Sequence, residues 1–187
     1  RYALTTLPAV SALRLRAIAK ANLKPSTEFR GYGNPVLALA KGEDRGGTYY
    51  RGAGEDGIRL GDPDRLRTMP SLPGTKTELL AMAGLYPSGT STLTMGAGAT
   101  EAALKNDSLL KQTNIIAFAT HGLLPSPGKG MDEPGLVFTP PKVASSEDDG
   151  ILTASEASQL SFLADWVILS ACNTASTASG AGGSDSL

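Results

Sequence analysis

The hydrophobic positions fall into two patterns that alternate along the chain. Short runs rich in apolar and β-branched residues, about four to eight long, are typical of buried strands. Such runs predict strands at Tyr2–Leu7, Pro35–Ala40, Asn114–Thr120 and Ala164–Ala171, with shorter strands at Ser91–Met95 and Gly135–Thr139. Between them, helical spacing and end signals predict helices at about Ala9–Leu23, Thr75–Leu85 and Ala99–Lys105, and from Thr153 to Leu160.

Two segments carry further local signals. Thr153, followed three residues later by Glu156, predicts a capping box at the start of the last helix. Residues 41–74 are rich in Gly, Asp, Arg and Pro, which predicts a long loop. Thr48–Arg51 and Ile58–Leu60 are candidates for a small hairpin within it.

Strands that alternate with helices predict an α/β fold, with a mainly parallel sheet and helices on both faces. In such sheets, binding sites lie beyond the carboxyl ends of the strands. The residues that directly follow each apolar run are therefore the first place to look for chemistry.

The composition is that of a globular domain. Of the 187 residues, 41% are hydrophobic and 19% are charged. One cysteine and one histidine exclude a disulfide framework and most zinc sites. No apolar run approaches the roughly 20 residues that cross a bilayer, and a net charge of -1 gives no overall attraction to nucleic acid. We therefore expect a soluble cytoplasmic domain without metal or cofactor, and no direct contact with nucleic acid or membrane.

The charge is unevenly distributed, with the first half of the chain basic and the second half acidic. Arg14, Arg16, Lys20 and Lys24 lie on or next to the helix predicted at Ala9–Leu23. Two interpretations remain open: a docking surface for an acidic partner, or the more common solvated helix face.

The only histidine and the only cysteine occupy equivalent positions. His121 follows the apolar run that ends at Thr120, and Cys172 follows the run that ends at Ala171. If those strands are neighbours, both side chains emerge at the same edge of the sheet. An imidazole within reach of a thiol takes its proton, and later protonates a leaving amine. Backbone N–H groups near Gly122 and Cys172 are candidates for an oxyanion hole, because glycine lets a substrate approach the main chain closely.

A purely structural interpretation competes with this one. Cysteine is among the most frequently buried residues, and a single histidine at a strand end more often has a structural role. Residue types and positions alone therefore favour the structural interpretation of both residues.

The local sequence changes that balance. Phe118–Gly122 and Val167–Thr174 resemble the two signatures of the CHAT domain, a caspase-like cysteine peptidase group related to caspases and separase. Further segments that match the family in order are Gly33–Pro35, Thr77–Leu80, Ala99–Lys105 and Asp149–Glu156. The family's Gly-Asp-Pro follows its first core strand, whereas the strand predicted here comes after Gly33. The resemblance covers about residues 35–175, and the His-to-Cys spacing of about 50 agrees with caspases.

The resemblance implies a His/Cys dyad that needs no acidic third member. It implies that His121 is the general base and acid, that Cys172 is the nucleophile, and that Gly122 is an oxyanion donor through its backbone. Asp165 matches a common acidic position of the family and is interpreted as structural, and Asn173 is assigned no role.

One departure from the family affects the expected domain. A CHAT domain continues beyond its cysteine strand with a helix and further strands, which are absent from this chain. We therefore expect a caspase-like fold that is incomplete at its C-terminus. Residues 1–175 would form its large-subunit-like portion, and residues 176–187 a flexible tail or linker. The partners expected are a protein substrate, a second chain that supplies the missing half, and a TPR-type regulatory module in the parent protein.

The function that the resemblance implies is a cysteine endopeptidase that cleaves a protein through an acyl-enzyme. The alternatives are a catalytically inactive interaction or scaffold domain, and transfer or hydrolysis of a non-protein acyl group by the same dyad. Asp132 and Glu133 allow two interpretations, a preference for a basic substrate residue or, more commonly, a solvated loop.

Overall fold

The computed structural model describes residues 27–37, 61–125, 130–162 and 164–171. Its elements, in chain order, are β1 (Thr27–Pro35), α2 (Pro63–Leu66), α3 (Pro73–Ala83), β2 (Ser91–Gly96), α4 (Glu101–Lys105), the 3₁₀ helix η1 (Ser108–Gln112), β3 (Thr113–Ala119), β4 (Gly122–Leu123), β5 (Gly135–Val137), β6 (Ile151–Thr153), α5 (Ala154–Gln159) and β7 (Trp166–Ser170).

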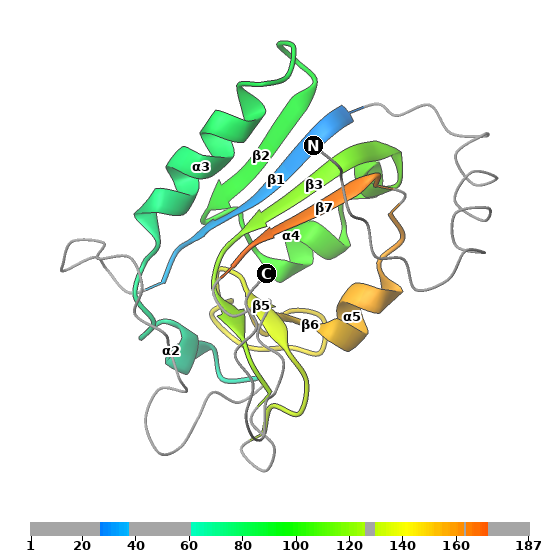
Figure 1. Cartoon of the computed structure of the whole chain (residues 1–187). Helices are drawn as coiled ribbons and strands as arrows, with labels where there is room; N and C mark the ends of the chain where they lie inside the picture. The colour runs from blue at the N-terminus through cyan, green and yellow to red at the C-terminus, as the bar shows by residue number, and fades with distance from the viewer. Residues whose placement is uncertain (1–26, 38–60, 126–129, 163, 172–187) are drawn as a thin grey trace, which may run out of the picture.

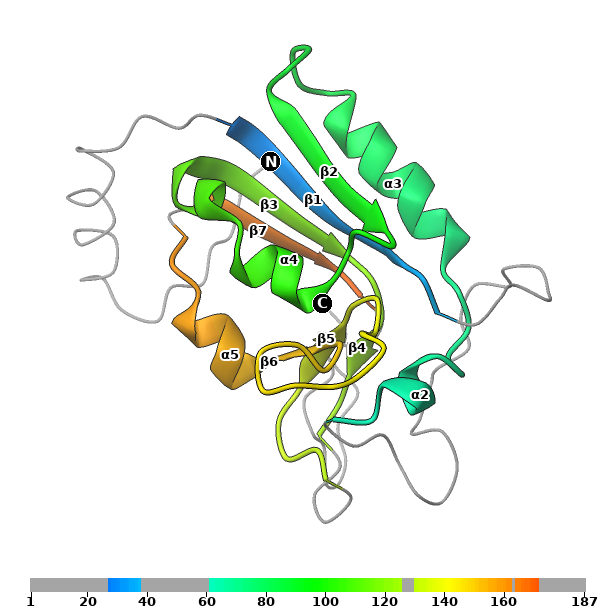
Figure 2. The same cartoon turned by 180° about the vertical axis from the view of Figure 1, so that it is seen from behind.

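Four strands form a parallel sheet in the order β2-β1-β3-β7 (Figure 1). Helix α3 covers one face of this sheet, and α4 and α5 lie on the other face, as the view from behind shows (Figure 2). The predicted α/β fold, with a mainly parallel sheet and helices on both faces, is confirmed.

Each face of the sheet has its own core cluster. On the face covered by α3, Leu79 packs against Phe29, Ala117 and Ala119 of the two central strands. On the opposite face, the cluster joins the sheet to α4, η1 and α5, and its buried members are Tyr32, Leu104, Leu110, Ile116, Phe118, Phe138 and Leu152. Strands β1 and β3 are thus buried on both faces, as expected for central strands of a parallel sheet.

A second, antiparallel sheet of three short strands follows the main sheet. Its order is β4-β5-β6, and a third core cluster lies beneath it, made of Leu37, Leu66, Met69, Leu123, Met131, Val137 and Ile151. Leu66 of α2 and Leu123 of β4 both belong to this cluster. Since β4 begins at Gly122, shortly after the end of β3, the cluster holds α2 and β4 beside the carboxyl end of β3.

Local end signals place the helices where the sequence predicts them. The side chain of Thr100 accepts a hydrogen bond from the Ala103 N–H and caps α4. Thr153 and Glu156 form the predicted capping box at the start of α5. Helix α3 begins at Pro73, two residues before the predicted start and within the segment predicted as a loop, because proline is preferred at the first helical position.

Of the strand predicted at Pro35–Ala40, the structure describes residues 35–37, and Val36 and Leu37 are not in a strand; the strand that forms here is β1, at Thr27–Pro35. Its apolar pattern is interrupted by Arg30 and two glycines, which conceals it in the sequence. Arg30 is nonetheless buried, since its guanidinium forms an ion pair with Asp107. Gly33–Pro35 therefore does end the first core strand, as in the family that the chain resembles.

Several expectations fall outside the described residues. They are the strand at Tyr2–Leu7, the helix at Ala9–Leu23, the hairpin within residues 48–60 and the tail at residues 176–187. Within the described ranges, no helix is both long and apolar enough to cross a membrane.

Candidate active site

His121 lies at the carboxyl end of β3, where the main sheet and the small sheet meet. The Thr120 N–H donates to the Ser170 carbonyl at 3.3 Å, which joins this point to β7. The His121 carbonyl accepts from the Val137 N–H at 3.0 Å, which joins it to β5. The backbone on both sides of the histidine is therefore fixed by neighbouring strands.

His121 is 7% exposed, and its imidazole has a defined hydrogen bond. Its Nε2 lies 2.9 Å from the carbonyl oxygen of Pro70. Because a carbonyl only accepts, Nε2 carries the proton and Nδ1 is the basic nitrogen of the neutral ring. Burial lowers the pKa of His121, an effect that the Pro70 carbonyl partly offsets. The ring is thus held neutral near pH 7, the protonation state that a general base requires.

The strand that leads to Cys172 runs beside the strand that leads to His121. Strands β3 and β7 pair in parallel from Ile115 opposite Trp166 to Ala119 opposite Ser170. His121 comes two residues after Ala119, and Cys172 comes two residues after Ser170. Cys172 itself is outside the described residues. The structure therefore brings together the two predicted strands and describes the position of His121, but not that of Cys172.

Gly122 is the first residue of β4 and stands opposite Leu136 of β5. The hydrogen bond from the Val137 N–H to the His121 carbonyl identifies Gly122 and Leu136 as a non-hydrogen-bonded pair of this antiparallel ladder. The N–H of Gly122 is consequently not used by β5. It is oriented away from that strand, directly beside the histidine.

Gly33 allows β1 to approach the end of β3 closely. A Cβ atom at this position would lie 2.1 Å from the carbonyl oxygen of Ala119, two residues before His121. Only glycine fits here. The next residue, Asn34, has a φ of 48°, so the chain leaves the strand through the left-handed region.

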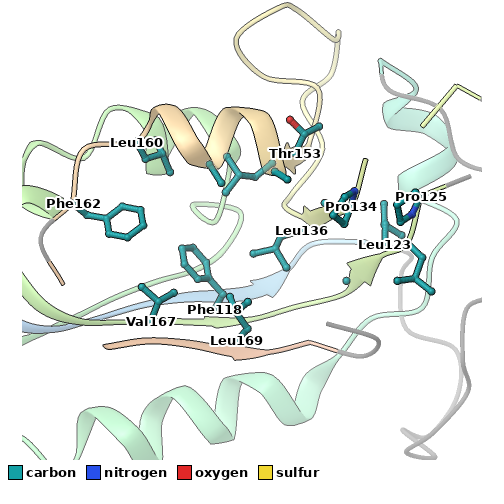
Figure 3. A pocket seen from close by; sticks show the side chains of 16 residues that line it. Phe118, Leu123, Pro125, Pro134, Leu136, Thr153, Leu160, Phe162, Val167 and Leu169 are labelled. Carbon is teal, nitrogen blue, oxygen red and sulfur yellow. The ribbon is translucent and has the colours of Figure 1, made fainter. Parts of the chain in front are cut away.

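An apolar cavity of about 490 Å³ adjoins the site (Figure 3). Its wall combines the sheet face at Phe118, Val167 and Leu169 with α5 and the segment after it. Figure 3 shows Phe118 and Phe162 pointing into the space between the sheet and that segment. Gly122 also lines this cavity, so the wall continues to the backbone beside His121.

Two acidic side chains that the sequence singled out, Glu133 and Asp165, have structural contacts. Glu133 accepts from the N–H and the hydroxyl of Ser155, both at 2.7 Å, in the first turn of α5. Asp165 accepts from the side-chain amide of Asn114 at 3.2 Å, near the amino ends of β3 and β7. Within the described part of the chain, no group of three His, Cys, Asp or Glu residues is arranged to hold a metal ion.

Two residues of the site carry no sequence signal for their contacts. Pro70 acts through its backbone carbonyl, which every residue has, from within a stretch predicted only as a loop. Glu78 accepts a hydrogen bond from the Ser170 hydroxyl at 2.9 Å and so links α3 to the end of β7. Its segment, Thr77–Leu80, resembles the family, but the sequence gives no reason to expect this contact.

The fold and this geometry define a class of protein. A parallel α/β sheet, with a histidine at the carboxyl end of one central strand and a cysteine just after the neighbouring strand, is typical of caspase-like domains. The chain belongs to the CHAT family, whose domain model matches residues 1–186. A search of curated proteins and a search of solved structures each gave no match. Membership of the family confirms the resemblance, and with it the caspase-like fold.

Proposed function

We propose that the chain is the peptidase portion of a cysteine endopeptidase, with His121 and Cys172 as its catalytic dyad. The observation that carries this proposal is the parallel register of β3 and β7, in which Ala119 pairs with Ser170. Two further residues in step would set Cys172 opposite His121, at the strand spacing of about 4.8 Å. Chain geometry alone keeps the Cα atom of Cys172 within about 7 Å of that of Ser170.

The proposed reaction follows from the state of the imidazole. Nδ1 of the neutral His121 takes the thiol proton as the sulfur attacks the substrate carbonyl. The N–H of Gly122, which β5 leaves unused, is aimed to stabilise the oxyanion of the tetrahedral intermediate. The imidazolium then protonates the leaving amine, and the acyl-enzyme forms. Water attacks this thioester with His121 as base, which releases the acid and restores the thiol.

The Pro70 carbonyl takes the role that an acid has in a catalytic triad. By accepting from Nε2, it fixes the ring orientation and keeps Nδ1 as the basic nitrogen. A neutral carbonyl stabilises an imidazolium less than a carboxylate does. This is consistent with the lowered pKa of His121 and with a dyad that needs no acidic third residue.

We propose that the apolar cavity receives a large apolar side chain of the substrate. Gly122 belongs both to its wall and to the proposed oxyanion site. Phe118 and Leu169, which face each other across β3 and β7, line the cavity three residues before His121 and Cys172. Three residues of extended chain span about 10 Å, so the cavity is within reach of a residue close to the scissile bond.

The test is cleavage of a proteome-derived peptide library by the intact chain and by two variants. Cys172→Ala is expected to abolish cleavage, and His121→Ala to reduce it by about 10²-fold or more. Cleavage that survives in Cys172→Ala at the rate of the unmodified chain would overturn the proposal.

An inactive interaction domain is the second candidate function. The burial of His121 and its hydrogen bond to Pro70 also suit a histidine whose role is to hold the end of β3 in place. This alternative predicts that Cys172→Ala changes neither cleavage nor partner binding, whereas the peptidase loses cleavage and keeps binding.

A further inference from the structure

Glu78 lies in the second turn of α3, the helix that covers one face of the main sheet. Its Oε2 accepts a hydrogen bond from the Ser170 hydroxyl at 2.9 Å. Ser170 pairs with Ala119, which packs in the cluster beneath α3, and side chains of paired residues in a parallel sheet point to the same face. The carboxylate of Glu78 is therefore fixed against the end of β7, two residues before Cys172.

The imidazole of His121 is bonded to the segment that leads into the same helix. Its Nε2 lies against the carbonyl of Pro70, three residues before α3 begins at Pro73. Figure 1 shows that α3 starts at the side of the sheet where the strand arrows end, and that it runs back from there. The first turns of α3 therefore border the carboxyl ends of β3 and β7, where the proposed dyad lies.

One oxygen of the Glu78 carboxylate is available to a further partner. Among the described residues, no lysine or arginine forms an ion pair with Glu78. Within the same residues, its Oε1 accepts no hydrogen bond, and this atom is not one of the buried polar atoms that lack a partner. Glu78 as a whole is partly exposed. The described chain thus fixes one carboxylate oxygen to β7 and leaves the other accessible beside the site.

Asp132 and Glu133, the two acids that the sequence suggests for a basic substrate residue, belong to the segment just before β5. Glu133 accepts two hydrogen bonds from Ser155 of α5, which lies on the face of the sheet away from α3 (Figure 2). Its carboxylate is therefore engaged in holding α5. Glu78 instead approaches the site from the side of the imidazole.

A carboxylate held in this way suits a guanidinium or an ammonium group. Charge-assisted hydrogen bonds are strong, and arginine and lysine carry their charge at the end of long side chains. Adjacent residues of an extended peptide point to opposite sides. One substrate can therefore place an apolar side chain in the cavity, on the sheet face of Val167 and Leu169, and a neighbouring basic side chain on the face of Glu78.

We propose that Glu78 is a specificity-determining residue of the site, and that its carboxylate binds an arginine or lysine side chain close to the scissile bond of the substrate. The inference rests on the peptidase function proposed above. Glu78 takes no part in the chemical steps, which need only the dyad and the oxyanion donor. The charge that it places beside Cys172 is therefore measurable without any turnover.

The first measurement compares two methanethiosulfonate reagents, one with an ammonium and one with a sulfonate group, on Cys172, the only thiol. In the 187-residue chain at low salt, we expect a higher ratio of cation rate to anion rate than for free cysteine. Glu78→Gln keeps an oxygen for Ser170 but removes the charge. The ratio is then expected to fall about fourfold, since a unit charge about 10 Å away in water changes each rate about twofold.

The matched control is Glu147→Gln, which removes an exposed carboxylate and is expected to leave the ratio unchanged. Circular dichroism checks that both variants are folded. The comparison with free cysteine needs no variant, so it applies even if Glu78→Gln does not fold. A ratio in the unmodified chain no higher than that of free cysteine, or the same ratio in folded Glu78→Gln, would overturn the proposal.

The second measurement uses paired peptides with arginine, or its neutral isostere citrulline, next to a bond that is cleaved in a Cys172-dependent way. Glu78→Gln is expected to lower kcat/KM about tenfold for the arginine peptide and to leave the citrulline peptide unchanged. An arginine preference that survives in Glu78→Gln would overturn the proposal while the peptidase function stands. Absence of any Cys172-dependent cleavage would contradict the peptidase function, and with it the substrate role of Glu78.

Discussion

At the scale of single residues, the tautomer of His121 depends on one backbone carbonyl. Pro70 accepts from Nε2 of His121 and so selects the tautomer in which Nδ1 is basic. Burial lowers the pKa of the ring, which keeps it neutral. The position and the protonation state of the proposed base are therefore set by local packing rather than by an acidic neighbour.

This state gives His121 a defined effect on stability. Because its pKa is lower in the folded chain than the unfolded value of about 6.5, the unfolded chain binds more protons as the pH falls below that value. The contribution of His121 is thus fully present above about pH 6.5 and is lost on acidification. Urea unfolding between pH 5 and 8 is expected to show a smaller acid loss in His121→Gln than in the unmodified chain. The same pH dependence in both would contradict the lowered pKa.

Gly33 sets the distance between β1 and the end of β3. In Gly33→Ala, the new Cβ atom meets the Ala119 carbonyl oxygen, which has to move together with the residues that lead to His121. We expect a loss of about 2 kcal/mol or more in the free energy of unfolding and a fall in cleavage. The matched control is Gly84→Ala, where the nearest atoms are at ordinary contact distance and φ is -66°. It is expected to leave both quantities nearly unchanged.

At the scale of elements, a buried ion cluster connects α4 to β6 and α5. Glu101, which is 1% exposed, accepts from the N–H groups of Asp149 and Gly150 at 2.9 and 3.1 Å. Lys105 joins Glu101 to Glu156, the capping-box residue of α5. Burial raises the pKa of Glu101 to about 7, although the hydrogen bonds from Lys105 and Asp149 lower it. The carboxylate thus depends on all of these partners.

Removing that carboxylate tests the cluster. Glu101→Ala leaves two backbone N–H groups without their acceptor and removes one of the two carboxylates that pair with Lys105, and is expected to cost about 3 kcal/mol of unfolding free energy. Glu101→Gln keeps an accepting oxygen and is expected to cost less. Glu147→Ala, at an exposed position nearby, serves as the control for urea denaturation. A cost for Glu101→Ala as small as that of the control would contradict this role.

The cavity between the sheet and α5 tests the proposed preference for apolar substrates. Ala157 lines it, whereas Ser158, the next residue of α5, is exposed and does not. Ala157→Phe fills part of the volume and is expected to raise KM for peptides with a large apolar residue near the scissile bond. Ser158→Phe is expected to have no effect. Unchanged peptide selectivity in Ala157→Phe would show that the cavity takes no part in substrate recognition.

Elements with strong local signals could be predicted from the sequence, and those held by distant contacts could not. The run that forms β3 and the Thr153–Glu156 capping box are specified by neighbouring residues, and both are confirmed. The sequence does not reveal strand β1, because its buried Arg30 is compensated by Asp107, far along the chain. The small sheet and the Pro70 contact depend on backbone groups, which have no residue signature. The resemblance indicated the His121 and Cys172 pair, and Cys172 remains a prediction.

At the scale of the whole molecule, the two edge strands of the main sheet, β2 and β7, differ in the side chains they present within the described residues. Strand β2 carries threonines on the face away from α3 and packs Leu93 and Met95 against the α3 cluster, whereas β7 presents exposed apolar side chains on both faces. The proposed base and the apolar cavity lie at the β7 side. Whatever covers β7 therefore also borders the site, so its presence is expected to affect the environment of Cys172.

The most direct test of the account is the rate at which iodoacetamide alkylates Cys172, the only thiol, as a function of pH. If His121 and Cys172 act as one dyad, the rate stays high down to about pH 6, since reactivity is lost only when the pair takes up a further proton. The rate is expected to collapse in His121→Ala and to remain in Glu147→Ala, at an exposed position. A rate that rises with a midpoint near pH 8.5, the value of an ordinary thiol, and that is unchanged by His121→Ala would contradict the dyad.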